Sequence, residues 1–352
     1  MALFVDIEKS FGQGAFVLRV QFQAKDGVTA LLGASGCGKS MTLKCIAGVE
    51  KPDRGRILLD GQTLFDSERH INLSPQKRHV GYLFQNYALF PNMTVAQNIG
   101  IPLHGKLPNA DRLKAVQEMI ARFYLDGLAG SYPAQLSGGQ QQRCALARIL
   151  IAKPRILMLD EPFSALDSYL RWQLEQEVRH VLEGFSGTTL FVSHNRDEVY
   201  RLCEEIIVMD HGHVDIHGEK WGLFHNPQTY ACCLLTGCKN ISPARRLSED
   251  TVYAEDWGLS LHTGVPVPED LRYVGIRAHQ FHPCAGPQAN AFPFTVRQVT
   301  QDTFSYILML QPTAEPGAKL LRWELDKKLF AKIGQAPPPY LSIAPEDLLL
   351  LR

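Results

Sequence analysis

The sequence predicts an α/β domain with a mostly parallel sheet, followed by a small all-β domain. Up to about residue 235, strand-like and helix-like segments alternate, which is typical of a parallel sheet flanked by helices. After about Cys238, apolar residues recur at every second position in short stretches, with Pro and Gly between them. This second pattern is typical of short antiparallel strands.

Composition limits the class of protein before any motif is considered. The chain has 352 residues, with 36 basic and 36 acidic side chains, a length that suggests two domains. A neutral chain lacks the basic surface with which proteins grip duplex DNA or acidic membranes. No apolar run approaches the roughly 18 residues of a membrane span. The start of the chain has no secretion signal, and its eight cysteines form no repeated framework. We therefore expect a cytosolic protein with free thiols.

In the first half of the chain, five segments have the character of regular elements. A strand is expected over residues 27–32, followed by a glycine-rich turn and a helix over residues 41–46. Short strands are expected at residues 57–59 and 80–84. Residues 110–125 are polar and compatible with a helix.

Between residues 155 and 210 the predicted strands are continuous apolar runs. Residues 155–159 (RILML) fit a parallel strand that is covered on both faces. From Ser168, apolar residues recur every four positions, as on one face of an amphipathic helix: these are Leu170, Leu174, Val178 and Leu182. Two more buried strands are expected at residues 188–192 and 206–209.

The predicted β domain is built from alternating stretches. The apolar positions that alternate are Phe294 and Val296, then Tyr306, Leu308 and Leu310, and later Leu321, Trp323 and Leu325. A last strand is expected from Leu348 onward. We expect two domains, residues 1–235 and residues 236–352.

The first chemical motif is a glycine-rich loop between a strand and a helix. It has the pattern GxxxxGK[ST], and its residues are Gly33, Ala34, Ser35, Gly36, Cys37, Gly38, Lys39 and Ser40. Glycines allow the backbone to wrap a phosphate chain, so that N–H groups and a helix N-terminus face the anion. Lys39 supplies a positive charge for the β- and γ-phosphates, and the Ser40 hydroxyl can bind Mg²⁺. The loop predicts a P-loop nucleotide-binding site.

The second motif is an acidic pair at the end of the strand at residues 155–159. Asp160 and Glu161 would lie at the C-terminal edge of the sheet, where α/β proteins bind ligands. We expect Asp160 to hold Mg²⁺ through water. Glu161 is placed to polarise the water that attacks the γ-phosphate.

The third motif is a second candidate phosphate-binding helix start. Leu136 is followed by Ser137, Gly138, Gly139 and Gln140 at the start of a polar helix. One chain with one nucleotide does not need two such elements. With this LSGGQ sequence the chain resembles the ATP-binding subunits of ABC transporters, over residues 1–235. The resemblance implies an ABC-type ATPase with a helical subdomain.

The resemblance also implies roles for single residues and a dimeric site. Gln85 matches the glutamine that contacts Mg²⁺ and the attacking water, and His194 matches the switch histidine that binds the γ-phosphate. Asp167, in the sequence 164–167, matches the loop that communicates across the dimer. Phe11 matches the aromatic residue that stacks on adenine. In this family the LSGGQ of one subunit covers the γ-phosphate held by its partner, so the resemblance implies a homodimer binding ATP and Mg²⁺.

Within the ABC family, the chain resembles importers. Residues 132–135 before LSGGQ resemble importer sequences, and residues 87–95 resemble the segment that packs against a membrane subunit. Residues 71–75 and 239–243 resemble the molybdate and sulfate branch, and residues 274–277 resemble a strand of its transport-associated domain, an oligonucleotide-binding-like (OB-like) fold. We therefore expect an ATPase at the cytoplasmic face of the membrane, bound to permease subunits and indirectly served by an extracellular solute-binding protein.

Several alternatives stay open. The sequence favours molybdate, tungstate or sulfate as cargo, with iron, polyamine or sugar import as alternatives. A non-transport ABC ATPase acting on nucleic acid is a further alternative, which the neutral charge disfavours, and no nucleic-acid partner is expected. The C-terminal domain could bind an oxyanion, another effector or nothing.

Overall fold

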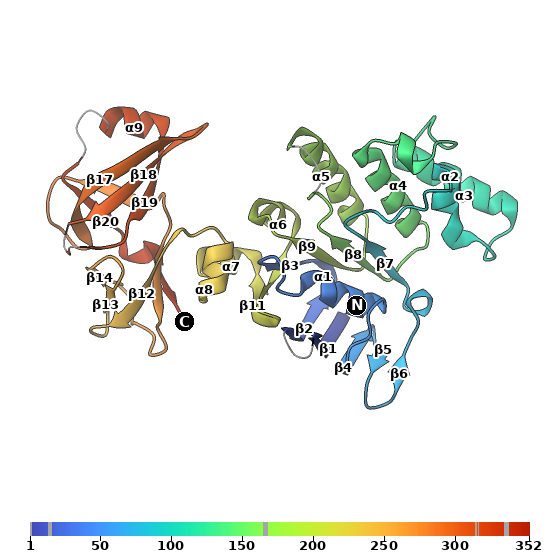
Figure 1. Ribbon diagram of the computed structural model, residues 1–352, viewed down its shortest axis with the longest axis horizontal. Coiled ribbons are helices and arrows are strands. Elements are labelled where there is room, and N and C mark those ends of the chain that lie inside the picture. The colour runs from blue at the N-terminus through green and yellow to red at the C-terminus, as the bar shows by residue number, and fades with distance from the viewer. Residues whose placement is uncertain (1, 13–15, 165–167, 314, 316, 334–337) are drawn as a thin grey trace. The chain divides into compact units, whose positions relative to one another are not determined.

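The computed structural model describes residues 2–12, 16–164, 168–313, 315, 317–333 and 338–352. They form two compact units, Met1–Lys220 and Trp221–Arg352 (Figure 1). None of the helices in these ranges combines the length and the apolar character that a membrane crossing requires.

An eleven-stranded sheet forms the centre of the first unit. Its strand order is β6-β5-β4-β1-β2-β11-β10-β3-β9-β8-β7. The strands are β1 (Ala2–Phe11), β2 (Phe16–Lys25), β3 (Gly27–Gly33), β4 (Arg54–Leu59), β5 (Gln62–Asp66), β6 (Ile71–Asn72), β7 (Val80–Leu83), β8 (Ile156–Asp160), β9 (Thr188–Ser193), β10 (Glu205–Asp210) and β11 (His213–Glu219). The strands predicted at residues 27–32, 57–59, 80–84, 155–159, 188–192 and 206–209 are all present.

The sheet is mixed, which corrects the expectation of a mostly parallel one. Strands β10, β3, β9, β8 and β7 run parallel to one another, whereas β11 pairs antiparallel with β10 and parallel with β2. Strands β1, β2, β4, β5 and β6 pair antiparallel. The difference arises because β1 and β2, each ten residues long, pair along their full length. The glycine-rich loop and the acidic pair lie at the C-terminal ends of the parallel strands β3 and β8.

Some helices of the first unit form a subdomain of their own. They are α1 (Lys39–Ala47), α2 (Val95–Gly100), α3 (Asn109–Arg122), α4 (Gly138–Leu150), α5 (Ser168–Glu183) and α6 (Arg196–Leu202). Helix α2 packs against α3 and α4, and these three form a helical subdomain that lies beyond β7 and apart from α1 (Figure 1). Three short 3-10 helices accompany them, η2 (Pro75–Lys77), η3 (Ile101–Leu103) and η4 (Pro133–Gln135).

The second unit contains two five-stranded sheets, so the predicted β-rich domain is confirmed. Their strand orders are β14-β13-β12-β15-β21 and β16-β20-β17-β18-β19. The strands are β12 (Asn240–Arg246), β13 (Thr251–Ala254), β14 (Leu259–His262), β15 (Tyr273–Ile276), β16 (Phe281–Cys284), β17 (Ala291–Gln301), β18 (Ser305–Pro312), β19 (Leu321–Asp326), β20 (Tyr340–Ile343) and β21 (Leu348–Leu351). Trp257 and Trp323 are the largest side chains buried in its core.

Helices occur in this unit as well. They are α7 (Lys220–His225), α8 (Tyr230–Leu235), α9 (Lys327–Ile333) and the 3-10 helix η5 (Pro345–Asp347). Helix α9 was not predicted. Within the described part of the chain, strand β21 is at an edge of its sheet and pairs with β15 alone.

The division between the units falls after the first residue of α7, between Lys220 and Trp221, whereas the sequence suggested a boundary between residues 235 and 236. The reason is that α8 packs with strands of the second unit. Cys233 and Cys238, on either side of its C-terminal turn, are buried against Leu349 and Leu351. In the same region Arg277 donates a hydrogen bond of 3.1 Å to the carbonyl oxygen of Thr236.

Candidate functional site

The glycine-rich loop joins the end of β3 to the start of α1. A Cβ atom on Gly33 would lie 2.4 Å from the Met209 carbonyl oxygen and 2.5 Å from Cys37 Sγ. Gly38 has a φ of 107°, in the left-handed region, and immediately precedes α1. Both positions therefore require glycine, the first for close packing on β10 and the second for its backbone conformation.

The N-terminus of α1 is suited to an anion. Its N-cap, Gly38, provides no side-chain hydrogen bond, and the first turn contains no acidic residue. The first N–H groups of the helix therefore point out of its positive end without a competing cap. Lys39 is buried, and its Nζ donates to the carbonyl oxygens of Gly33 at 2.8 Å and Ala34 at 2.9 Å. The ammonium group is thus held beside the loop that would carry a phosphate chain.

Asp160, at the end of β8, is hydrogen-bonded through both of its oxygens. Ser40 Oγ donates to Oδ1 at 2.8 Å, and the Tyr82 hydroxyl donates to Oδ2 at 2.8 Å. Burial raises the pKa of Asp160, and the two hydrogen bonds oppose that rise because they favour the carboxylate. The carboxylate therefore has a fixed orientation toward α1.

This arrangement fits a divalent cation. Mg²⁺ prefers oxygen ligands in octahedral geometry at about 2.0–2.1 Å, so neighbouring ligands lie about 3 Å apart. Ser40 Oγ and Asp160 Oδ1 are hard oxygen donors with a separation of 2.8 Å. The two side chains that the sequence assigns to Mg²⁺ therefore lie close enough to act on one cation, Ser40 directly and Asp160 through water.

Two predicted catalytic side chains, Gln85 and His194, converge on the third, Glu161. Gln85 Nε2 donates to Glu161 Oε2 at 3.3 Å, and His194 Nδ1 lies 3.4 Å from Glu161 Oε1. Glu161 has a φ of 47°, uncommon for a residue with a side chain, and its N–H donates to the Val192 carbonyl at 3.0 Å. The turn after β8 thus directs this carboxylate toward residues from β7 and β9.

The neighbouring turns hold these side chains in place. Ser164 Oγ lies 3.3 Å from Gln85 Nε2 and donates to the carbonyl oxygen of Glu161 at 3.1 Å. Asp167, also predicted to belong to this loop, is outside the described residues. At the end of β9, Ser193 Oγ donates to Glu198 Oε2 at 2.6 Å and accepts from the Asn195 N–H at 2.9 Å. This pair of bonds fixes the turn that carries His194.

Ser137 is the N-cap of α4, as its position in LSGGQ suggests. Its Oγ accepts from the Gln140 N–H at 3.3 Å, and Gln140 Oε1 accepts from the Ser137 N–H at 2.9 Å. Figure 1 shows α4 within the helical subdomain, apart from α1. No hydrogen bond among the described residues connects residues 137–140 with residues 33–40. One chain therefore does not bring its two predicted phosphate-binding elements together.

Phe11 is half-buried and packs against the core of the first unit. Its ring centroid is 6.0 Å from that of Phe16, and Lys9 Nζ lies 5.3 Å from the centroid of Phe11. The Phe16 ring in turn lies 3.5 Å from the Cβ position of Gly38. Stacking of Phe11 on adenine stays a prediction.

Comparisons with known proteins agree with this geometry. The ABC transporter family matches residues 18–164. A sulfate/thiosulfate import ATP-binding protein, CysA of Gloeobacter violaceus, is 38% identical over 291 residues, which are 78% of this chain and 83% of that protein. The chain belongs to the ABC transporter family. A molybdenum import ATP-binding protein, ModC of Rhodospirillum rubrum, is 40% identical over 214 residues, 61% of this chain and 58% of that protein.

Solved ABC structures confirm the predicted fold class. The dimeric structure of a post-hydrolysis state of the ATP-binding cassette MJ0796, bound to ADP and Pi, superposes with a TM-score of 0.54 at 28% identity. The match covers 62% of this chain and 98% of that one. The resemblance inferred from the motifs, to importer ATP-binding subunits of the sulfate and molybdate type, is likewise confirmed by the relatives.

Sequence reasoning missed two residues of this ABC site, Tyr82 and Arg148. Tyr82 lies in the apolar run of β7 and has the pattern of a core aromatic residue, although its hydroxyl reaches Asp160. Arg148, on α4, donates to backbone carbonyls near Gln85. The available signal was a polar group at an otherwise buried position, since such a group needs a partner.

The ABC unit also has a cavity of about 470 Å³ between α2 and α3, which we call the α2–α3 cavity. Its lining residues are Asn92, Met93, Ala96, Gln97, Gly100, Ile101, His104, Arg112, Leu113 and Val116. They include Asn92 and Met93 of the segment at residues 87–95. The lining is largely apolar, and Leu113 is among the exposed large hydrophobic side chains.

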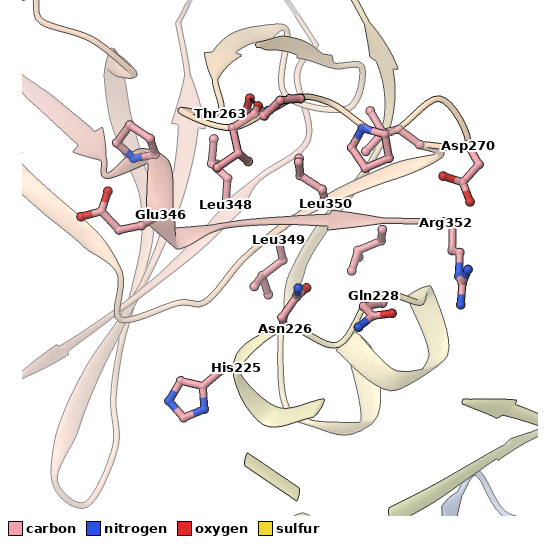
Figure 2. Close-up of a pocket in the computed structure, with 16 residues that line it drawn as sticks. His225, Asn226, Gln228, Thr263, Asp270, Glu346, Leu348, Leu349, Leu350 and Arg352 are labelled. Atoms are coloured by element: carbon pink, nitrogen blue, oxygen red, sulfur yellow. Dashed lines mark hydrogen bonds between the residues drawn. The ribbon is translucent and has the colours of Figure 1, made fainter. Parts of the chain in front are cut away.

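The second unit of this ABC protein has a groove of about 610 Å³ along the edge strand β21, which we call the β21 groove. Figure 2 shows β21 running through it, with Asn226 and Gln228 on one side and Thr263 and Asp270 on the other. Asp270 and Glu346 line it together with Arg352, so neither sign of charge dominates.

Proposed function

We propose that this chain is the ATP-hydrolysing subunit of an importer that takes up sulfate or molybdate. The observation that carries the proposal is the convergence of Gln85 and His194 on Glu161, next to the Ser40–Asp160 pair. The relatives named above are import ATP-binding proteins for sulfate/thiosulfate and molybdenum.

Each residue has a role that its position supports. The glycine loop and Lys39 bind the β- and γ-phosphates of ATP. Ser40, Asp160 and Gln85 would hold Mg²⁺, which neutralises charge on the phosphates when it is bound. Glu161 orients the attacking water and accepts its proton, and His194 donates a hydrogen bond to the γ-phosphate.

A complete site requires a second copy of the chain. Ser137 and Lys39 lie in separate parts of one chain, so the signature helix of one copy would cover the γ-phosphate bound by the other. The dimeric state of the MJ0796 cassette supports a homodimer. Two ATP molecules would then lie between the copies, and closure of the pair would depend on both.

The α2–α3 cavity is the proposed contact with the membrane permease. Its apolar lining fits an amphipathic helix of a partner. Residues 92 and 93 belong both to the cavity and to the segment that follows Gln85. The subunit would therefore work at the cytoplasmic face of the membrane, and the solute-binding protein would act on the permease from outside. The second unit would be a regulatory domain.

The decisive test of ATP hydrolysis is Glu161→Gln. Turnover should fall by about a hundredfold or more, because general base catalysis contributes about that much, while ATP binding persists and the dimer is trapped. The matched control is Glu183→Gln, an exposed carboxylate at the end of α5, which should turn over like the wild type. Normal turnover of Glu161→Gln would contradict the proposed site.

The cargo is tested separately by uptake. Cells that lack this chain should lose uptake of radiolabelled sulfate or molybdate, and the wild-type chain should restore it while Glu161→Gln should not. Loss of iron, polyamine or sugar uptake instead would contradict the proposed cargo and leave the ATPase assignment intact.

A further inference from the structure

Arg148 connects the signature helix to the segment that follows Gln85. From the last turn of α4, its Nη1 donates to the Ala88 carbonyl at 2.7 Å and its Nη2 to the Tyr87 carbonyl at 2.9 Å. The guanidinium carbon also lies 5.4 Å from the centroid of the Phe90 ring. One side chain therefore makes three interactions with residues 87–90, which we call the clamped segment.

The backbone of the clamped segment has a conformation that needs support. Tyr87 has a φ of 59° and Ala88 a φ of 45°, so two successive residues with side chains are in the left-handed region. Such conformations are costly and persist when the surrounding structure holds them. The planar guanidinium fork matches two neighbouring carbonyl groups, and bonds from a charged donor are stronger than neutral ones.

The clamped segment lies between two parts of the proposed machinery. Gln85, which bonds Glu161, precedes it, and Met93 of the α2–α3 cavity follows it. Its far end is fixed by the buried Asn98, whose Oδ1 accepts from the Phe90 N–H at 2.8 Å and whose Nδ2 donates to the Phe90 carbonyl at 3.1 Å. Arg148 therefore holds the near end and Asn98 the far end.

We propose that Arg148 is a positioning residue that fastens the clamped segment to α4. The helix that begins at Ser137, the side chain of Gln85 and the α2–α3 cavity would then shift as one body. In this way a contact in the cavity would change the position of Gln85 and of the signature at the same time. The functional part of this inference rests on the proposed ATPase function, whereas the clamp itself rests on the contacts alone.

The clamp is tested by amide hydrogen exchange of the full chain. In Arg148→Met, amides of residues 87–93 should exchange about tenfold faster or more, since the loss of one charge-assisted bond corresponds to about that factor. The matched control is Arg122→Met, which also removes a guanidinium over a phenyl ring, that of Phe123 at 6.0 Å. Unchanged exchange at residues 87–93, or an equal effect of the control, would overturn the clamp.

Steady-state ATP hydrolysis tests the positioning role. Arg148→Met should lower kcat about tenfold or more and leave the KM for ATP within about twofold, because the glycine loop is untouched. Arg148→Lys keeps the charge without the fork and should give an intermediate kcat. If Arg148→Met does not fold, amide exchange and kcat are both measured on Arg148→Lys instead. An unchanged kcat in an active preparation would overturn the inference. Absence of hydrolysis in the wild type would instead contradict the proposed function.

Discussion

The Tyr82 hydroxyl donates a hydrogen bond of 2.8 Å to Oδ2 of Asp160, the carboxylate whose Oδ1 accepts from Ser40. Tyr82 and Asp160 lie on the neighbouring parallel strands β7 and β8. Desolvation raises the pKa of Tyr82, and the adjacent carboxylate raises it further, so the hydroxyl remains a donor. Tyr82 therefore fixes the orientation of a proposed Mg²⁺ ligand from the interior of the sheet.

Tyr82→Phe should weaken the Mg²⁺ site with little change in packing. The Mg²⁺ concentration for half-maximal hydrolysis should rise about three- to tenfold, because one hydrogen bond is worth about 1 kcal/mol. The affinity for a fluorescent ATP analogue should fall by the same factor when Mg²⁺ is present. In the absence of Mg²⁺, the affinity should equal that of the wild type. Tyr124→Phe, on an exposed tyrosine, is the control. A Mg²⁺ dependence identical to the wild type would remove Tyr82 from the site.

Mixtures of two inactive variants test the shared site. Lys39→Ala should lose ATP binding in its own loop, and Ser137→Arg should block the γ-phosphate of the partner. Each variant alone should be inactive, whereas mixing them can restore at most one of the two sites per dimer. Full activity of either variant by itself would exclude a site shared between copies. Circular dichroism should show that both variants fold, since loss of an N-cap costs only about 1 kcal/mol.

His194→Ala should lower turnover without lowering stability. The loss should be about a hundredfold or more, as for other hydrogen-bond donors that act on transition-state charge. The side chain of His194 is 62% exposed, so the free energy of unfolding should change by no more than about 0.5 kcal/mol. His180→Ala removes another exposed histidine beside a glutamate and should have no effect on hydrolysis. A large drop in unfolding temperature would show that His194 acts structurally.

Glu198 should give the protein a defined pH dependence of stability. Burial raises its pKa above the ordinary value of 4.5, although the Ser193 hydroxyl opposes this. The folded state therefore keeps the proton to a higher pH than the unfolded state, and stability is lost as pH rises above about 4.5 through the raised pKa.

Glu198→Gln removes this titration. The measured quantity is the free energy of unfolding of the wild type minus that of Glu198→Gln. This difference should fall as pH increases from below 4.5, and then level off. Urea unfolding at a series of pH values measures the difference. A constant difference across the series would show that Glu198 titrates alike in both states.

The sequence predicted those parts of the site that depend on contiguous residues. The glycine loop, the acidic pair and the LSGGQ helix start each consist of neighbours along the chain, so their local geometry follows from residue type. The parallel strands were predicted for the same reason, because each is a continuous apolar run, which is typical of a strand with both faces buried.

Contacts between distant residues could not be predicted in this way. Tyr82 and Asp160 are 78 residues apart, and Arg148 and Ala88 are 60 apart. An aromatic residue in a strand and an arginine late in a helix have ordinary local explanations, and only the folded sheet brings them to their partners. The antiparallel pairing of β1 with β2 was missed likewise, because alternation along a strand does not specify its neighbour.

The walls of the β21 groove have a consequence for solubility. An edge strand with unpaired backbone groups can recruit the edge of another sheet and start aggregation. Here residues 263–271, which include two prolines, flank β21 on one side, and the turn between α7 and α8 flanks it on the other. The carbonyl oxygen of Gln228 in that turn already accepts the N–H of Arg352 at 3.0 Å. These walls lie between the free edge of β21 and any second sheet, so they protect the β-rich unit from edge-to-edge association.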